Sequence, residues 1–508
     1  MLTRNSPNLC WRLSLLLLFP LLVPAQDLKE FEKKITEFTL ANGFHFIVLE
    51  RHDAPVVSFH AMANVGSVDD PAGSSSMAHM FEHMIGKGTT SVGTTNWPEE
   101  QKALAAVETA YDKYDAELWK GPAAETKKVN QLHDELNAAI AKANSYVDQN
   151  AYIRVISESG GVGFNAGTAS DYTTYFYSLP SNRAELWFLM QSEWFRRPVF
   201  REFYKERDVV REERRMRVES DVQGKLQEVL MATAFMAHPY RNMIGWASEI
   251  EGLRAKDADK FFKKYYSPGN ITIAVVGDID PAQVKRLADK YYSSIPSGEP
   301  PPPVTAVEPP QEGEKRAVLE SDSQPLLAIA YKRPSQSDPD DPVFDVISTI
   351  LTGGRTGTLY KELVTDKKIA LEADSGATTP SGKYPNLFEI YSVPSPEHSV
   401  EDNEKAVYEI LEKLKTTKVD EATLNRVKTK IRAGLIRQLA GNSGLASQLA
   451  FYHVEYGDWR MMFKGIDMIG KVTADDVQRV ARQYFVDRGR TVAYTVPPKT
   501  AAPQEVAK

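Results

Sequence analysis

The fold is decided by the stretch GSSSMAHMFEHMIGKG, residues 73–88. The small residues at its start can open a helix, and the glycines at its end can close one. On such a helix His79 and His83 lie one turn apart on the same face, so both imidazoles can bind one metal ion. Glu82 lies beside them and can take a proton from water held at that ion. The spacing therefore predicts a metal centre rather than two unrelated surface histidines.

Two carboxylates are candidates for a further metal ligand. A zinc ion in a catalytic site takes three protein ligands and keeps one position open for water. The stretch ERDVVREE at residues 206–213 places Glu206 and Glu213 seven residues apart. That spacing puts both on one face of a helix predicted over about 200–219. A dense run of Glu and Arg is more usually a solvated helix face, and the residues alone leave both interpretations open.

The first 25 residues have the pattern of an export signal. Arg4 and Arg12 make the N-terminal region positively charged, and an apolar stretch covers residues 13–23. Small residues follow this stretch and end at Ala25, where a signal peptidase could cleave. The apolar stretch is shorter than the ~20 residues that a spanning helix needs, although an uncleaved membrane anchor is an alternative. Cleavage near Ala25 predicts a secreted or periplasmic chain with no stable membrane span.

The composition excludes several classes of protein. The chain has 508 residues, of which 42% are hydrophobic and 25% charged, as in an ordinary globular protein. The formal net charge of −7 offers no broad basic surface, so nucleic acid is not expected as a partner. The only cysteine, Cys10, lies in the predicted signal. A metal ion in the mature chain must therefore be bound by His and carboxylate side chains.

Strand-like segments begin and end the first part of the chain. Residues 36–40 and 44–49 are strand-like and flank the turn Asn42-Gly43, which favours a β-hairpin. Residues 56–62 also form a strand-like segment, and residues 270–277 have the pattern of a buried strand. Helical periodicity fills much of the chain between them.

A proline-rich segment divides the chain into two halves. Seven of the fifteen residues at 296–310 are proline, which favours an extended connector. We predict a linker at 296–312 between an N-terminal domain at 28–295 and a C-terminal domain at 313–498, with a tail at 499–508. The segments 257–274 and 476–493 echo each other residue by residue at a constant offset. Each segment predicts a helix that ends in two aromatic residues and is followed by a strand. The recurrence of this pattern indicates a duplication.

Residues 98–148 are rich in Glu, Lys and Ala, with Gly121-Pro122 in the middle. This composition predicts a helical hairpin inserted into the N-terminal domain and solvated on one side. An insertion without a specific function is the simpler interpretation, and a role in gating or in contact with a partner is the alternative.

Taken in order, these motifs resemble the insulinase/pitrilysin family of zinc peptidases, which includes the mitochondrial processing peptidases. The resemblance rests on four segments: 79–89, 160–175, 206–213 and 270–278. It implies an α+β fold of two tandem homologous halves. Each half would be a mainly antiparallel sheet with helices packed on one side, and the two would form a clam-shell chamber.

The resemblance also implies a role for each candidate residue. His79, His83 and Glu213 would bind one Zn²⁺ per chain, with Glu82 as the general base. Glu206 would support the ligands as an additional carboxylate. Asn165 and Ala166 would lie on an edge strand that pairs with the backbone of a peptide substrate, a mode that makes little demand on substrate sequence.

The chain departs from the family pattern in two places. The separation between His83 and Glu213 is much longer than the family's usual gap, and the excess corresponds to the segment at 98–148. Members that act alone usually carry an Arg and, seven residues later, a Tyr in the C-terminal half. Val364 and Leu371 occupy those positions when the helix at 359–363 is aligned. Neither side chain can donate a hydrogen bond, although an alignment slip of a few residues would remove this difference.

We therefore expect a secreted or periplasmic zinc metalloendopeptidase that hydrolyses peptides or unfolded segments. A related subunit bearing the Arg and Tyr would complete it as a heterodimer, and a homodimer is the other arrangement. The main alternative is a non-catalytic binding or assembly subunit that retains the fold and the metal. A zinc-dependent hydrolase of non-peptide substrates is a more remote one.

Overall fold

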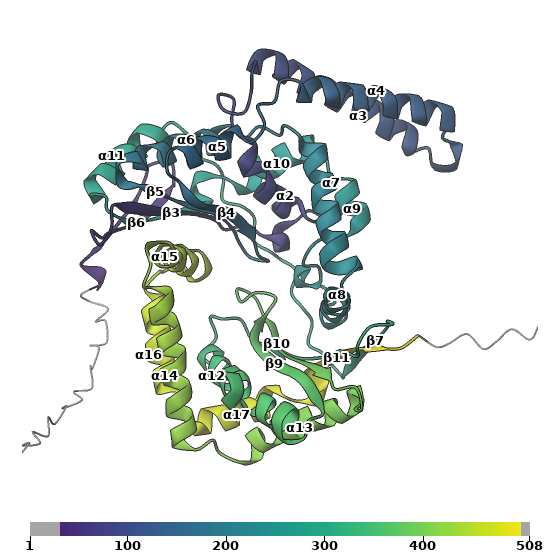
Figure 1. Cartoon of the computed structure of the whole chain (residues 1–508), viewed down its shortest axis with the longest axis vertical. Helices are drawn as coiled ribbons and strands as arrows, with labels where there is room; N and C mark the ends of the chain where they lie inside the picture. The colour runs from purple at the N-terminus through teal and green to yellow at the C-terminus, as the bar shows by residue number, and fades with distance from the viewer. Residues whose placement is uncertain (1–30, 499–508) are drawn as a thin grey trace, which may run out of the picture.

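A computed structural model describes residues 31–498, and each half of this chain is organised around one β-sheet (Figure 1). The predicted signal at 1–25 and the tail at 499–508 lie outside the described residues. The two sheets and the helices packed on them confirm the predicted α+β fold with two related halves.

The first sheet has six strands in the order β1-β2-β6-β3-β5-β4. Only β2 and β6 run parallel, so the sheet is mainly antiparallel as predicted. The Asn42-Gly43 turn joins β1 to β2, and Gly43 has a φ of 111°, which favours glycine. The strands are β1 (Ile35–Thr39), β2 (His45–Glu50), β3 (Val56–Ala63), β4 (Val162–Thr168), β5 (Thr173–Pro180) and β6 (Ile271–Gly277).

The second sheet repeats this arrangement with five strands, in the order β7-β11-β8-β10-β9. Its single parallel pair, β7 with β11, corresponds to β2 with β6 in the first sheet. The order β2-β6-β3-β5-β4 is thus reproduced strand for strand, and β1 is the additional strand of the first half. The strands are β7 (Lys315–Glu320), β8 (Leu327–Arg333), β9 (Ala370–Thr379), β10 (Asn386–Pro394) and β11 (Arg490–Val496).

The offset seen in the sequence is retained in the structure. The last strands of the halves, β6 and β11, begin at Ile271 and Arg490. The helices before them are α10 (Ala255–Tyr265) and α17 (Ala474–Tyr484). The first residues of these two helices are separated by the same number of residues as the first residues of the two strands. The duplication inferred from the sequence echo is therefore confirmed by equivalent elements in equivalent places.

Helices of each half cover one face of its own sheet. In the first half the aromatic residues Phe59 and Trp187 stack at 4.7 Å between their ring centroids and belong to a large buried cluster. The other helices of this half are α2 (Met77–Met84), α3 (Trp97–Leu118), α4 (Thr126–Asn144), α5 (Ala151–Glu158), α6 (Ala184–Arg196), α7 (Phe203–Arg214), α8 (Val222–Ala234), α9 (Ala247–Glu251) and α11 (Pro281–Tyr292). Those of the second half are α12 (Asp341–Thr352), α13 (Val400–Thr416), α14 (Glu421–Gln438), α15 (Asn442–Tyr456) and α16 (Met461–Lys471).

The opposite face of each sheet is covered by a helix from the other half. Helix α15 lies against the first sheet (Figure 1). Its Leu445 and Leu449 are buried in one cluster with Ile47 and Met62 of that sheet. Residues of α8 are buried in the same way against Ala328 and other residues of the second sheet. The prediction that helices pack on one side of each sheet therefore holds only for the helices that belong to the same half as the sheet. In the whole chain the two halves exchange helices, and each completes the core of the other.

The proline-rich segment at 296–312 contains neither helix nor strand. It is nevertheless anchored to the first half through the buried carboxylate of Glu308. This side chain accepts hydrogen bonds from the backbone N–H groups of Met236, Ala237 and His238. Such a carboxylate holds the connector against the end of α8.

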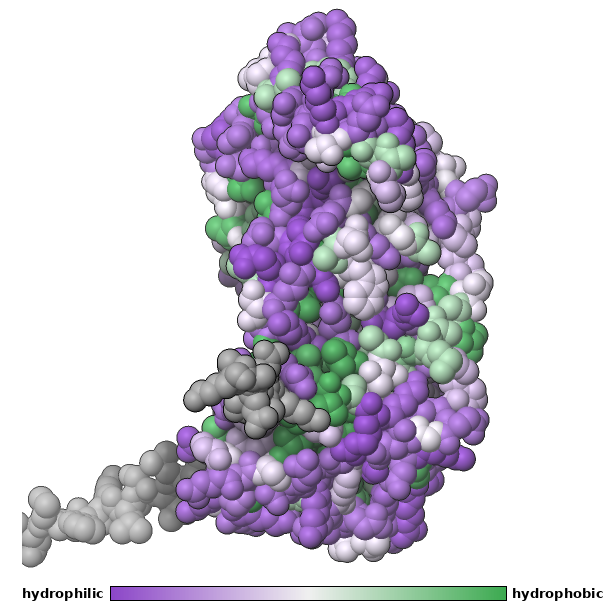
Figure 2. Space-filling view, turned by 90° about the vertical axis from the view of Figure 1, so that its right-hand side faces the viewer, coloured by the Kyte–Doolittle hydropathy of each residue, from purple (hydrophilic) through white to green (hydrophobic). Residues whose placement is uncertain are grey.

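Helices α3 and α4 form a hairpin that extends away from the body of the first half (Figure 1). The surface at this end of the molecule is mainly hydrophilic, whereas hydrophobic residues gather lower on the same face (Figure 2). Trp119, at the end of α3, is an exception because 82% of its surface is exposed. Within residues 31–498, we find no helix both long enough and apolar enough to cross a bilayer.

Truncating a side chain in the exchanged helix tests how far the two halves depend on each other. Leu449 is completely buried between α15 and the first sheet. We expect Leu449→Ala to lower the free energy of unfolding by about 2–5 kcal/mol, since it removes buried apolar surface and leaves a cavity. Ile436→Ala on α14 is the control, because Ile436 is 48% exposed and should change stability by less than about 0.5 kcal/mol. Denaturant unfolding measures both, and equal effects would contradict the exchange as a stabilising contact.

Candidate metal centre

The helix α2 that carries both histidines is held at its start by Asp70. One carboxylate oxygen accepts a hydrogen bond from the Ser76 backbone N–H at 2.6 Å, and the other accepts one from Ala78 at 2.8 Å. These bonds satisfy backbone donors that have no partner within the helix. Ser76 itself has a φ of 72°, so the chain turns sharply into the helix at this point. Asp70 therefore determines where α2 begins.

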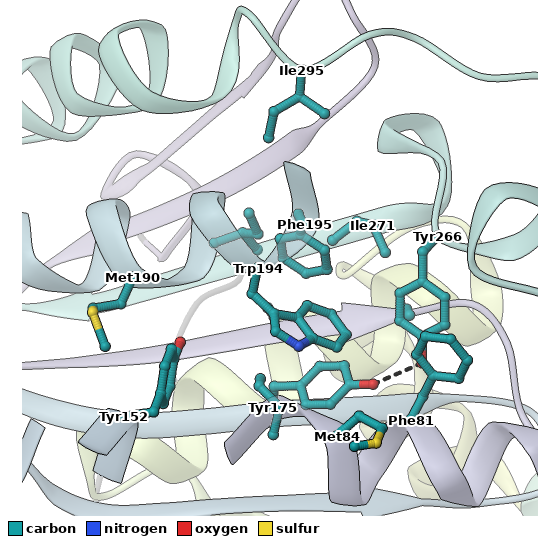
Figure 3. Packing of buried hydrophobic residues seen from close by; sticks show 14 of the residues in the cluster. Phe81, Met84, Tyr152, Tyr175, Met190, Trp194, Phe195, Tyr266, Ile271 and Ile295 are labelled. Carbon is teal, nitrogen blue, oxygen red and sulfur yellow. Dashed lines mark hydrogen bonds between the residues drawn. The ribbon is translucent and has the colours of Figure 1, made fainter. Parts of the chain in front are cut away.

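One side of α2 is buried in an aromatic cluster of the first half (Figure 3). The Phe81 ring packs against Tyr266, with 4.9 Å between ring centroids. Beneath it the Tyr175 and Tyr266 hydroxyls form a hydrogen bond of 2.7 Å. Met80 and Met84 are likewise buried. This packing fixes the rotation of α2 about its axis and leaves His79, Glu82 and His83 only partly buried.

A buried ion pair holds the chain just after α2. The Arg201 guanidinium donates to the Glu100 carboxylate at 2.8 Å, and both side chains are almost completely buried. Arg201 also donates to the backbone carbonyls of Lys87, Thr89 and Val92. A charge pair of this kind adds little net stability, but it imposes one geometry on the segment it binds. The sequence did not reveal it, because Glu100 and Arg201 are 101 residues apart.

The structure brings together His79, His83 and Glu213, the three residues predicted to bind zinc. Glu213 Oε2 lies 3.4 Å from His79 Nε2 and 3.3 Å from His83 Nε2. One ligand atom from each residue lies within 4.8 Å of the other two. Ligands at about 2.1 Å around a tetrahedral zinc ion are spaced by about 3.4 Å. The donor atoms and their spacing therefore fit a zinc ion.

Glu213 comes from the helix predicted over about 200–219. The α-helix α7 begins at Phe203, after Glu202 with a φ of 55°, and its last turn widens into a π-helical segment, Arg215–Glu219. Its interaction with His79 lowers the pKa of the Glu213 carboxyl to about 2, although burial opposes this shift. Arg217 forms an ion pair with the other carboxylate oxygen of Glu213. Glu213 is therefore an anion at neutral pH, as a metal ligand must be.

Glu206 lies behind His83 rather than among the three ligand atoms. Its Oε2 is 3.4 Å from His83 Nδ1, and its Oε1 is 2.5 Å from Lys87 Nζ. Burial raises the pKa of Glu206, but the hydrogen bonds from His83 and Lys87 outweigh burial and leave it lowered. An ionised carboxylate at Nδ1 orients the imidazole so that Nε2 faces the other ligands. The sequence singled out Glu206 but not Lys87, which follows α2 and holds Glu206 in place.

Glu82 lies beside the three ligands without joining them. Its Oε2 is 4.0 Å from His79 Nε2, which is too far for a direct hydrogen bond. Its side chain is 24% exposed, so it remains accessible to solvent. Such a position suits a group that exchanges protons with water near the metal more than it suits a ligand.

Asn165 and Ala166 lie on β4, the last strand of the first sheet. Asn165 is paired with Phe176 and Ala166 with Tyr175, both on β5, while the other side of β4 has no strand beside it among residues 31–498. In Figure 1 β4 runs next to α2, the helix that carries the histidines. The predicted edge strand therefore exists and lies close to the metal centre.

Val364 and Leu371 lie in the second half. Val364 belongs to a π-helical turn, Tyr360–Asp366, and packs against the core of that half. Leu371 is on β9, the edge strand of the second sheet, and is 54% exposed. Neither position offers a hydrogen-bond donor from its side chain.

Two domains of one peptidase family match this chain. Residues 121–246 match the domain described as Insulinase (Peptidase family M16). Residues 252–431 match the Peptidase M16 inactive domain. Both matched ranges begin after His79 and His83. The histidine pair is therefore evidence that the two domain matches do not include.

Known relatives agree with these matches. The zinc protease PqqE of Helicobacter pylori is 27% identical over 472 residues, which cover 90% of this chain and 92% of that protein. A probable mitochondrial-processing peptidase subunit beta from Arabidopsis thaliana is 24% identical, over 72% of this chain and 71% of that protein.

Solved structures show the same fold. A protease from Helicobacter pylori matches with a TM-score of 0.77 at 26% identity, over 91% of this chain and 100% of that chain. The first half of the periplasmic protease PqqL from Escherichia coli has a TM-score of 0.66 over 91% of this chain and 92% of that chain. Its 15% identity makes this second likeness one of fold alone.

The contact between Glu206 and His83 can be tested through metal affinity. Glu206→Gln removes the negative charge behind His83, so we expect zinc affinity to fall about 10–100-fold. Glu212→Gln is the matched control on the same helix, because Glu212 is 58% exposed and pairs with Arg215 instead. Competition titration with a zinc chelator measures both variants. Unchanged affinity in Glu206→Gln would show that this carboxylate does not support the ligands.

Proposed function

This chain belongs to peptidase family M16, and we propose that it is a zinc metalloendopeptidase that hydrolyses peptides or unfolded segments. The observation that carries the proposal is the convergence of His79, His83 and Glu213 at the spacing of tetrahedral zinc ligands. Glu82 beside these ligands supplies the one further group that hydrolysis requires.

The ligand residues and their supports would hold the ion in a fixed position. When bound, a zinc ion polarises the scissile carbonyl and makes a water molecule more acidic. His83 is oriented by Glu206, and Glu206 is held in turn by Lys87. The anionic Glu213 partly neutralises a divalent cation, which two neutral imidazoles alone would not do.

Glu82 carries the proton in this proposal. Its carboxylate accepts a proton from the water that attacks the peptide carbonyl carbon, and it later delivers that proton to the leaving amine nitrogen. The C–N bond breaks, and one carboxylic acid and one amine are released. The short reach from Glu82 to the ligand atoms allows both transfers without a large movement of α2.

The edge strand β4 suggests how a substrate is held. A peptide in extended conformation can add to a free strand edge through backbone hydrogen bonds, which depend little on its sequence. Asn165 and Ala166 would lie along the bound strand. Peptides and unfolded regions offer extended segments with free backbone groups, so they are the expected substrates. Closure of the chain as a clam shell over the peptide is part of the same proposal.

A second subunit is proposed because Val364 and Leu371 stand where an Arg and a Tyr are expected. We infer that a related chain bearing both residues forms a heterodimer with this one, and a homodimer is the other arrangement. The Arabidopsis relative, whose name describes it as a subunit, supports this inference. We also propose a secreted or periplasmic location, supported by the leader pattern at 1–25.

A non-catalytic subunit is the competing candidate. It is favoured by one finding, since residues 252–431 match a domain described as inactive. That match begins at residue 252, near the end of the first half, and most of it lies in the second half. All four residues of the proposed centre lie before it in the first half. Such a subunit would bind zinc and a peptide without cleaving it.

Replacing Glu82 separates catalysis from metal binding. Glu82→Gln keeps the shape of the side chain but cannot accept the proton, so we expect peptide cleavage to fall about 10²–10⁴-fold. Zinc content should stay at the wild-type level, because Glu82 is not among the ligands. Cleavage of an unstructured peptide and zinc analysis measure the two effects. Full activity in Glu82→Gln would rule out the mechanism, and Glu212→Gln serves as the control.

Mixing experiments test the second subunit. We expect the isolated chain to bind zinc but to cleave peptides slowly. Adding a related chain from the same genome that lacks the histidine pair but bears the Arg and Tyr should raise the rate at least tenfold. Light scattering should show a heterodimer at the same time. An isolated chain as active as the mixture would argue against the partner.

A further inference from the structure

A second group of three potential metal ligands lies where the two halves meet. Glu37 is on β1, His45 is on β2, and His453 is near the end of α15. One ligand atom from each lies within 4.8 Å of the other two. The group is distinct from the catalytic centre. Glu37 and His45 share the face of the first sheet that α15 covers, whereas α2 packs on the opposite face.

The first-half ligands are oriented by hydrogen bonds to their other atoms. The Thr39 hydroxyl lies 2.9 Å from His45 Nδ1, so that ring nitrogen is already engaged. One Glu37 carboxylate oxygen accepts a hydrogen bond of 3.0 Å from the Trp459 indole. The remaining atoms, His45 Nε2 and Glu37 Oε1, face each other at 3.3 Å. This is the pattern of supported metal ligands, in which an outer partner leaves the inner atom free to bind.

Two buried nitrogen atoms of the group have no hydrogen-bond partner within residues 31–498. They are His45 Nε2 and His453 Nδ1. The 3.3 Å approach of Glu37 to His45 is therefore an electrostatic contact and not a hydrogen bond. Buried polar atoms without partners cost free energy and call for an explanation. A bound cation would provide partners for both nitrogens at once.

The charges around the group are compatible with a cation. Arg460 lies 3.4 Å from Glu37 Oε2, on the side of the carboxylate away from His45. Its guanidinium is shared with Glu32 and Asp458, so its positive charge is balanced by other carboxylates. Two imidazoles and one carboxylate suit Zn²⁺ and its neighbours among the divalent transition metals, whereas Ca²⁺ and Mg²⁺ prefer oxygen ligands.

We propose that Glu37, His45 and His453 bind a second divalent transition-metal ion, which ties α15 of the second half to the first sheet. The two imidazole rings now stack in parallel with 4.0 Å between centroids, so one must tilt for both lone pairs to meet an ion. His453 is the ring that can tilt, because its side chain forms no hydrogen bond in the described part of the chain. Three protein ligands leave a fourth position for water.

Counting bound zinc tests this proposal. The full chain is stripped with a chelator, equilibrated with Zn²⁺, desalted and measured by elemental analysis. We expect two ions per chain in the wild type and one in His453→Phe, a substitution that keeps the aromatic stacking on His45. His79→Ala should also retain one ion, and the double variant none. His133→Ala on α4 is the control, because His133 is exposed and should leave two.

The same set distinguishes the two metal sites. One ion in the wild type that survives His453→Phe would overturn the second site and leave the catalytic centre intact. One ion lost in His453→Phe but kept in His79→Ala would support the second site and overturn the proposed function. Should His453→Phe fail to fold, Glu37→Gln replaces it, and the ion count should again fall by one. As a second readout, Zn²⁺ should raise the Tm of His79→Ala but not that of His79→Ala combined with Glu37→Gln.

Discussion

Both sheets of this protein are hydrophobic on both faces, and each face must be covered by helices. All seven residues of β6 are buried, although their side chains alternate between the two faces. Helices of one half cover only one face of its sheet. The second face is covered by α15 in the first sheet and by α8 in the second. Because neither half can bury its sheet alone, two of the hydrophobic clusters contain residues from both halves, and burial of apolar surface holds the halves together.

The proposed metal centre depends on the same burial. The aromatic cluster around Phe81 holds α2 against the sheet, and Asp70 and Arg201 determine where the helix begins and how the chain leaves it. Metal ligands need positions accurate to a fraction of an ångström, and rigid neighbours supply that accuracy. The charged residues behind the ligands, Glu206 and Lys87, complete the support. Packing of the surroundings and the charged contacts of Glu206 therefore act together to fix the geometry of the site.

The two faces of the first sheet carry two groups of potential ligands with different origins. The group on α2 and α7 lies within one half of the chain. The group of Glu37, His45 and His453 arises only where α15 crosses from the second half. A duplicated chain that exchanges helices therefore creates contacts that neither copy would contain alone.

Features that repeat over a few residues or recur along the chain could be predicted from the sequence alone. The spacing of His79 and His83 predicts a shared helix face, the strand-like segments on either side of Asn42-Gly43 predict a hairpin, and the echo between the two halves predicts the duplication. Periodicity could not choose between Glu206 and Glu213, which share a face. The tertiary structure placed Glu213 at both Nε2 atoms and Glu206 at Nδ1 of His83, because α7 packs across α2 in one register. Contacts such as Arg201 with Glu100, or His45 with His453, leave no local pattern, since only the folded chain brings such distant residues together.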